Sequence, residues 1–266
     1  MDNTNNGELP YTCQVKVHRP LCLELEKFIP RMWDIIAAIE AERPNCALVI
    51  EALCSLQFTL DKAKLVIQHC SESSKLYLAI TRRRIFSRCE KIRRALDLYL
   101  SQIQNAVPLV LAAKISEIVR DLRAEEFSVD IEEDEAGKAI RELLEKDFPD
   151  SDSIKKAELV AVQMATLRLK ITSPAALLEE KTALKQQLDK VNDTNQREKE
   201  CLKYLLYLLV KYGKFIRQLQ TCSSHKQRRQ CHHKSVELTA NYAVGENQAD
   251  GSFNIEVGDN AVVLGS

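Results

Sequence analysis

The stretch CALVIEALCSLQFTLDKAKLVIQHC, residues 46–70, decides the fold. Its apolar side chains recur at alternating spacings of three and four, which places them on one face of a long helix. This seam consists of Cys46, Val49, Leu53, Leu56, Leu60, Ala63, Ile67 and Cys70. A seam of this kind is stable only when neighbouring helices cover it. The stretch therefore predicts a helix packed inside a helical bundle.

The scarcity of glycine also favours helices. The 266 residues include seven glycines, and between Glu8 and Val244 only Gly137 and Gly213 occur. Tight β-hairpins and glycine-rich phosphate loops are difficult to build from so few glycines. We therefore expect an all-α protein, a multi-helix bundle of seven or eight helices without strands.

The apolar periodicity covers only part of the chain. Residues 1–15 are polar and are predicted to form a disordered leader, and the glycine-containing tail over residues 221–266 is predicted to be disordered as well. A single helical domain is expected over residues 16–220.

Prolines and an aspartate mark expected helix boundaries. Pro30 interrupts an apolar stripe that runs from Leu21 to Ile39, which predicts a kink or break near Ile29. Pro108 is suited to the first turn of a later helix. Asp130 is expected to cap the helix after that, whose first residues are acidic and suit the positive end of the helix dipole.

Charge and hydropathy exclude several classes of protein. The chain has 38 basic and 38 acidic residues, so it lacks the cationic excess of a nonspecific nucleic-acid binder, and no specific nucleic acid is expected as a partner. No apolar run approaches the length of a transmembrane helix, and the polar amino terminus does not resemble a secretory signal. Nine cysteines without regular spacing predict reduced thiols in the cytoplasm, with the nucleus and the inner face of the plasma membrane as alternative locations.

Titratable residues do not form a recognisable catalytic pattern. His69 and Cys70 are neighbours, but adjacent residues on a helix point about 100° apart and cannot form a nucleophile–base pair. Cys46, Cys70 and Cys89 lie on apolar faces and are expected to be buried as small apolar residues. Trp33 lies off the main stripe and is expected to be partly buried. We therefore predict no catalytic residue and no cofactor.

The tail holds a set of potential zinc ligands, Cys222, His225, Cys231, His232 and His233. Their spacing matches none of the usual structural zinc patterns. We expect no metal here, and zinc binding by the tail stays an alternative.

The neutral chain contains two oppositely charged segments. The acidic segment, residues 121–135, has eight acids and one base. A candidate patch for partners or lipid lies on the predicted helix that follows residue 81, and it consists of Arg82, Arg83, Arg84, Arg88, Lys91, Arg93 and Arg94. Such a patch suits acidic protein segments or anionic lipid head groups. The alternatives are that the two segments neutralise each other across the bundle, or that both are merely solvated faces.

Several ordered stretches of the chain resemble a known family. They are ERPNC (42–46), IEALCSL (50–56), DKAK (61–64), CSESSKLYLAIT (70–81), ITSPAALL (171–178) and YLLYLLVKYG (204–213). They are similar to the amino-terminal helical domain of plant U-box proteins with armadillo repeats, which are ubiquitin-protein ligases. The likeness spans roughly residues 15–219, and the stretch 70–81 is far more specific than helical periodicity.

The chain departs from the family pattern in two places. After residue 81 the family suggests a Gly-Asp turn, whereas this chain has Arg82, Arg83 and Arg84. A U-box would open with a Cys-Pro-Ile segment and contain an Asp-Pro-Val turn, but none of the seven prolines follows a cysteine or an aspartate. We therefore expect the U-box, and with it ubiquitin-transferase activity, to be absent from this chain.

The resemblance implies a role in protein ubiquitination. In the family the U-box binds the charged conjugating enzyme, and other regions recruit the substrate. This chain is therefore expected to recruit a protein partner, either a substrate or a receptor-like kinase, with self-association as a further alternative. A peripheral membrane bundle that binds anionic lipid through the basic patch is the competing interpretation.

Overall fold

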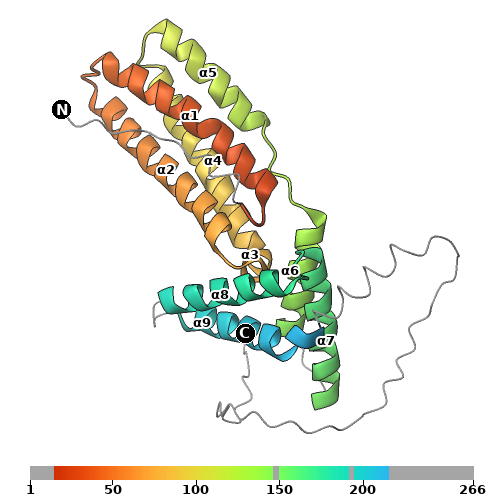
Figure 1. Cartoon of the computed structure of the whole chain (residues 1–266). Helices are drawn as coiled ribbons and strands as arrows, with labels where there is room; N and C mark the ends of the chain where they lie inside the picture. Colours follow the sequence, from red (N-terminus) through yellow and green to blue (C-terminus); the bar gives the residue numbers. More distant parts are fainter. Residues whose placement is uncertain (1–14, 146–149, 192–194, 216–266) are drawn as a thin grey trace, which may run out of the picture. The chain divides into compact units, whose positions relative to one another are not determined.

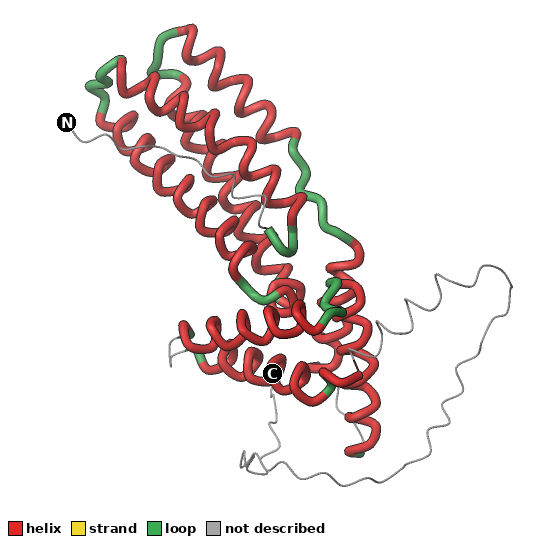
Figure 2. Tube along the Cα trace, viewed as in Figure 1, coloured by secondary structure: helices red, strands yellow, loops and turns green. Residues whose placement is uncertain are grey.

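The computed structural model describes residues 15–145, 150–191 and 195–215. These residues form α-helices and no strand, as predicted (Figures 1 and 2). The helices are α1 (Arg19–Ala41), α2 (Ala47–Glu72), α3 (Lys75–Ile80), α4 (Arg82–Gln104), α5 (Leu109–Ala124), α6 (Ile131–Glu145), α7 (Ser151–Arg168), α8 (Pro174–Lys190) and α9 (Gln196–Lys211). The described residues thus hold eight long helices, in agreement with the predicted seven or eight, together with the six-residue helix α3.

The predicted termini fall almost entirely outside the described residues. Of the leader, only Val15 is described, and it already packs against the core. The backbone N–H of Lys16 donates to the carbonyl of Cys70 at 3.2 Å, and Val17 is buried. The packed part of the chain therefore includes the last residue of the predicted leader.

Helices α1, α2, α4 and α5 pack side by side and form what we call the amino-terminal group (Figure 1). The seam of α2 is buried from Val49 to Cys70, as predicted. Leu56 and Leu60 are completely inaccessible, and Leu100 of α4 and Ile115 of α5 are equally buried. Burial of apolar side chains along whole helices is the dominant stabilising contribution in this group.

Cys46 differs from the rest of the seam. It is exposed, so the prediction that it is buried was wrong. Helix α2 begins at Ala47, and Cys46 precedes it with an extended backbone. Its side chain therefore does not follow the helical face that the spacing assumed.

Helix α1 continues through Pro30, so the predicted break does not occur. Proline removes one backbone hydrogen bond and crowds the preceding turn. Phe28, Ile29 and Met32 on either side are buried, and their packing keeps both halves of the helix in place. Trp33 in the same helix is partly buried, as predicted, with Nζ of Lys64 lying 4.8 Å from its ring.

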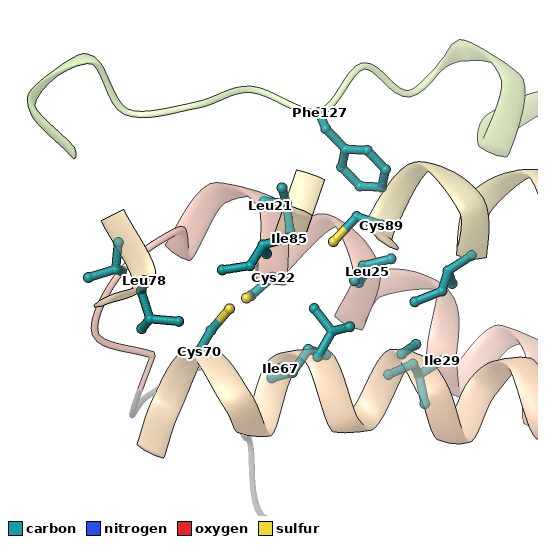
Figure 3. Packing of buried hydrophobic residues seen from close by; sticks show 14 of the residues in the cluster. Leu21, Cys22, Leu25, Ile29, Ile67, Cys70, Leu78, Ile85, Cys89 and Phe127 are labelled. Carbon is teal, nitrogen blue, oxygen red and sulfur yellow. The ribbon is translucent and has the colours of Figure 1, made fainter. Parts of the chain in front are cut away.

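Three buried cysteines meet in the amino-terminal group: Cys22, Cys70 and Cys89 (Figure 3). A hydrogen bond with Cys70 raises the pKa of the Cys22 thiol, and burial adds to this effect. Burial likewise raises the pKa of Cys89. The Cys22 and Cys89 thiols are therefore protonated. All three buried cysteines pack as small apolar groups, as predicted for Cys70 and Cys89.

Helices α6 to α9 form what we call the carboxy-terminal group, in which α6 pairs with α7 and α8 pairs with α9. Helix α3 packs on α4 and also on α6, α8 and α9. Its approach to α6 is close, because a Cβ atom added to Gly137 would lie 2.1 Å from the carbonyl oxygen of Ala79. The short helix α3 therefore connects the two groups.

Local hydrogen bonds begin several of these helices. Oδ1 of Asp130 accepts from the N–H groups of Glu132 and Glu133, which confirms the predicted cap of α6. Asp150 and Ser173 cap α7 and α8 in the same way. Among the described residues, no helix combines the length and the apolar character needed to cross a lipid bilayer.

Candidate functional site

The first turn of α3 is joined to α8 by several hydrogen bonds. Oγ of Ser74 accepts from the N–H of Tyr77 at 3.2 Å and donates to Glu180 of α8. The same carboxylate accepts from the N–H groups of Lys75 and Leu76, at 3.1 and 2.9 Å. These groups are backbone donors that a helix start leaves unpaired. Glu180 therefore acts as a second cap of α3, supplied from more than a hundred residues away in the sequence.

Glu180 is a buried carboxyl group. Burial raises its pKa, while the hydrogen bonds from Ser74, Leu76 and Lys75 oppose that rise. Gln187, two turns further along α8, accepts from the N–H of Ser74 at 2.9 Å. The stretch 70–81, which carries much of the family resemblance, is thus the place where α8 is fixed to α3.

A second buried carboxylate, Glu158 of α7, holds α9. It accepts from Nζ of Lys211 and from the hydroxyl of Tyr212, both at 2.7 Å, and from the hydroxyl of Tyr204 at 3.1 Å. Burial and the bond to Glu158 raise the pKa of Tyr212 to about 12. These three partners belong to the stretch 204–213, so this stretch too matches a structural contact.

The basic patch divides into paired and unpaired residues. Nε of Arg82 lies 2.9 Å from Asp134 of α6. Arg93 donates to Glu90 and to the carbonyl of Leu122, both at 2.9 Å. Arg82 and Arg93 are half-buried and connect helices. Arg94 is exposed, and its Nε lies 3.7 Å from Glu90. An exposed ion pair at this long distance contributes little to stability.

The other four members of the patch, Arg83, Arg84, Arg88 and Lys91, are exposed. None of them forms an ion pair with another residue in the described ranges. Their charges are therefore available to a ligand, whereas those of Arg82 and Arg93 are used inside the fold.

The acidic segment partly neutralises basic residues of the same chain. Its ion pairs join Asp121 to Arg31 at 2.7 Å, Asp134 to Arg82, and Glu135 to Arg168. Glu133 contacts both the N–H and Nδ1 of His18, at 2.9 and 3.1 Å. The alternative of mutual neutralisation thus holds for Arg82 but not for the four exposed residues.

Two concave regions lie near the start of α9. The larger, a groove of about 800 Å³, is lined by residues of α2, α8 and α9 that include Leu65, Gln68, His69, Gln186 and Gln187. The smaller, a cleft of about 250 Å³, is lined by Arg83 and Arg84 of α4, Arg197 of α9 and residues of α3. Glu198 lines both.

No catalytic pair is assembled at His69. Its Nδ1 lies 2.9 Å from Oγ of Ser73, whereas Cys70 points into the core beside Cys22 (Figure 3). Burial and the nearby Arg88 lower the pKa of His69. In the residues that the structure describes, no group of three or more His, Cys, Asp or Glu side chains is arranged to hold a metal ion. The candidate zinc ligands of the tail lie outside these residues.

An exposed apolar stripe runs along α2 opposite its seam. Ile50, Cys54, Phe58 and Leu65 share one helical face and are exposed, Phe58 by 61% and Leu65 by 62%. Nζ of Lys62 lies 4.1 Å from the ring centroid of Phe58. Leu65 also lines the larger groove, so the stripe, which we call the α2 stripe, leads into that groove.

Comparison with curated proteins gives clear relatives. U-box domain-containing protein 5 of Arabidopsis thaliana is 41% identical over 170 residues, which are 64% of this chain. The chain is related to plant U-box domain-containing proteins. U-box domain-containing proteins 6 and 7 of Arabidopsis thaliana are 36% and 37% identical over 203 residues, 76% of the chain. This confirms the resemblance seen in the sequence.

The aligned regions are only part of each relative. The chain spans 23–26% of the length of these U-box proteins. No family model matches the chain, and no solved structure matches it.

The sequence did not reveal Glu158, Glu180 or Arg197 as site residues. Glu180 lies at a helix position whose neighbours one turn away in both directions are apolar, which is a signal of a buried acid, and Glu158 has apolar neighbours only at Ile154, Ala161 and Val162. Arg197 lies in a charged run without any distinguishing pattern. Its place beside Arg83 and Arg84 depends on how α9 packs.

Proposed function

We propose that this chain is the partner-recruiting region of a plant U-box ubiquitin-protein ligase. The observation that carries the proposal is the 36–41% identity to three U-box domain-containing proteins. A substrate or a receptor-like kinase is the class of partner we propose. In this role the chain holds a protein in reach of the ubiquitin-transfer machinery and supplies no nucleophile of its own.

The surface supports protein recruitment. Contiguous exposed apolar side chains on a folded domain indicate a protein-binding face. The α2 stripe offers exposed apolar side chains, with Asp61 between Phe58 and Leu65, on a helix whose other face is fixed in the core, so that the stripe keeps its shape when a partner binds. Rigid presentation lowers the entropic cost of association.

The first experiment fuses the full chain to a U-box from another protein. Candidate partners are identified by proximity labelling and then tested with purified components, conjugating enzyme and ubiquitin. We expect the fusion to ubiquitinate a bound partner more strongly than the U-box alone. Phe58→Asp should reduce both binding and transfer, whereas Leu98→Asp, an exposed site on α4, serves as the matched control. Equal transfer to partner and to an unrelated protein would contradict recruitment.

A companion assay tests whether the chain transfers ubiquitin by itself. The unfused chain is mixed with charged conjugating enzyme. We expect no free polyubiquitin chains, and their formation would show that the chain has ligase activity of its own.

The competing function is binding to anionic membranes. It is favoured by the four exposed basic residues of the patch, Arg83, Arg84, Arg88 and Lys91. Co-sedimentation with phosphatidylcholine vesicles, with and without phosphatidylserine, tests it at low and high salt. Binding that requires the anionic lipid and is lost in an Arg83→Glu/Arg84→Glu/Arg88→Glu variant would favour this function over protein recruitment.

A further inference from the structure

Three arginines from distant parts of the sequence line one small cleft. Arg83 and Arg84 lie in the first turn of α4, and Arg197 lies in the first turn of α9. All three are exposed, and within the described ranges none has an ion-pair partner. Arginines left unpaired around a concave site point to an anionic ligand, because each guanidinium can donate two parallel hydrogen bonds to a phosphate or carboxylate group.

The backbone around the cleft adds to its positive character. Helix α4 begins without a side-chain cap, and the N–H groups of Arg84 and Ile85 donate to the carbonyl of Thr81. The amino end of a helix carries a partial positive charge. The carbonyls at the end of α3, which would oppose it, are instead bonded to Arg141, at 3.1 Å for Ala79 and 3.2 Å for Ile80.

One acid, Glu198, also lines the cleft. Its carboxylate accepts from the hydroxyl of Tyr77 and from the side-chain amide of Asn195. It is therefore held by two neighbours and does not pair with the arginines. Three guanidinium groups against one carboxylate leave the cleft with a positive charge.

The larger groove lies beside the cleft, and its lining favours a peptide as the molecule that carries the anionic group. Gln68, Gln186 and Gln187 line it, and Leu65 adds an apolar contact. Oε1 of Gln187 accepts from Ser74, and the amide nitrogen of Gln68 donates to Glu72. The remaining amide donors and acceptors can pair with the main chain of an extended peptide. Such amides offer nothing to the acyl chains of a lipid.

We propose that the cleft binds the phosphate of a phosphorylated side chain in a partner protein, with the adjoining partner segment extended along the groove. Arg83, Arg84 and Arg197 contact the phosphate, and the glutamines contact the peptide main chain. This inference rests on the proposed role in partner recruitment, and it makes recruitment depend on phosphorylation of the partner.

The test measures binding of the full chain to fluorescent peptide libraries with a central phosphoserine, and to the same libraries with unmodified serine. We expect the phosphorylated libraries alone to bind, more weakly as salt increases. Arg83→Gln and Arg197→Gln should each weaken binding at least about tenfold, a loss of about 1.4 kcal/mol. Arg197→Lys should recover only part of the affinity that Arg197→Gln loses, because an ammonium group cannot form the bidentate contact.

Lys91→Gln is the matched control. Lys91 is exposed on the same helix and lies about 10 Å along its axis from Arg84 at 1.5 Å per residue. Its loss should change binding less than about twofold, since charges at this distance are largely screened. Equal losses for Lys91→Gln and Arg197→Gln would overturn the cleft as the site, as would equal binding of both libraries. Circular dichroism of each variant checks that the fold is kept.

Two further outcomes separate this inference from the proposals above. Displacement of a bound phosphopeptide by phosphatidylserine vesicles, but not by phosphatidylcholine vesicles, would assign the arginines to lipid instead. If Arg197→Gln leaves ubiquitination of a recruited partner unchanged while Phe58→Asp abolishes it, the cleft inference fails and partner recruitment stands.

Discussion

The two groups of helices bury different kinds of side chain. In the amino-terminal group the interior consists mainly of aliphatic side chains, together with Phe28, Met32 and the thiols, and its buried Thr59 bonds to the carbonyl of Ser55 within the same helix. In the carboxy-terminal group two buried carboxylates, Glu158 and Glu180, bond to other helices. Apolar burial tolerates many arrangements, whereas a buried carboxylate requires particular donors. The carboxy-terminal group therefore adds a few specific polar contacts to its apolar interior, whereas the amino-terminal group depends mainly on many interchangeable apolar contacts.

The largest effect is expected in the apolar interior. Leu56→Ala removes a completely buried side chain from the centre of α2 and should lower the free energy of unfolding by about 2–5 kcal/mol. Urea unfolding followed by circular dichroism measures it. Leu65→Ala, at an exposed site on the same helix, should cost less than about 1 kcal/mol. Similar losses at both sites would mean that the seam of α2 is not the main source of stability.

Replacing Glu180 tests the contacts that fix α8. Glu180→Leu keeps a side chain of similar size but leaves the hydroxyl of Ser74 and the N–H groups of Lys75 and Leu76 without an acceptor. We expect a loss of about 2–4 kcal/mol in the same unfolding assay, because buried donors without partners are costly.

The neighbouring residue supplies the control for this prediction. Glu179 is exposed, and within the described ranges its ion pair is with Lys16, so Glu179→Leu should change stability by less than about 0.5 kcal/mol. Hydrogen exchange should show that Glu180→Leu lowers the protection of backbone amides most strongly in α8. An equal loss of amide protection in α2 and α8 would contradict the difference between the two groups.

A substitution at the close contact between α3 and α6 should lower stability somewhat less than Glu180→Leu. A Cβ atom at Gly137 would lie 2.1 Å from the carbonyl oxygen of Ala79, so Gly137→Ala forces a backbone shift. Although alanine is the better helix former, we expect the substitution to lower the free energy of unfolding by about 1–3 kcal/mol. At Gly213 the nearest atom is a side-chain carbon of Leu177 at 3.3 Å. Gly213→Ala should therefore be neutral or slightly stabilising, and thermal unfolding compares the two variants. A stabilised Gly137→Ala protein would show that α3 and α6 do not pack this closely.

The smallest effect concerns alkaline pH. The pKa of Tyr212 is raised from 10.0 to about 12, first by burial and then by its bond to Glu158. Between these values the folded state keeps a proton that the unfolded state releases, so the contribution of Tyr212 to stability is lost as pH rises through this window. Tyr212→Phe should cost about 1 kcal/mol at neutral pH and lose less stability than wild type on raising the pH to about 11. Parallel stability curves for the two proteins across the window would contradict this role.

Much of the architecture could be predicted because it depends on local patterns. The seam of α2, the cap at Asp130 and the half-buried Trp33 each follow from a few neighbouring residues. A break at Pro30, one of the two predicted outcomes, does not occur, because packing of its buried neighbours outweighs the local cost of proline in a helix. Cys46 was misjudged because periodicity does not fix the residue at which a helix begins.

The amino-acid sequence by itself determined that this protein is built of helices, and its ordered stretches pointed to plant U-box proteins before any fold was known. Which charges are free was decided only by the tertiary structure. Arg82 and Arg84 are two residues apart on one helix, yet the first pairs with Asp134 and the second lines a cleft with Arg197. The physical reason is that helical periodicity depends on neighbouring residues, whereas pairing of a charge depends on side chains that folding brings from elsewhere in the chain.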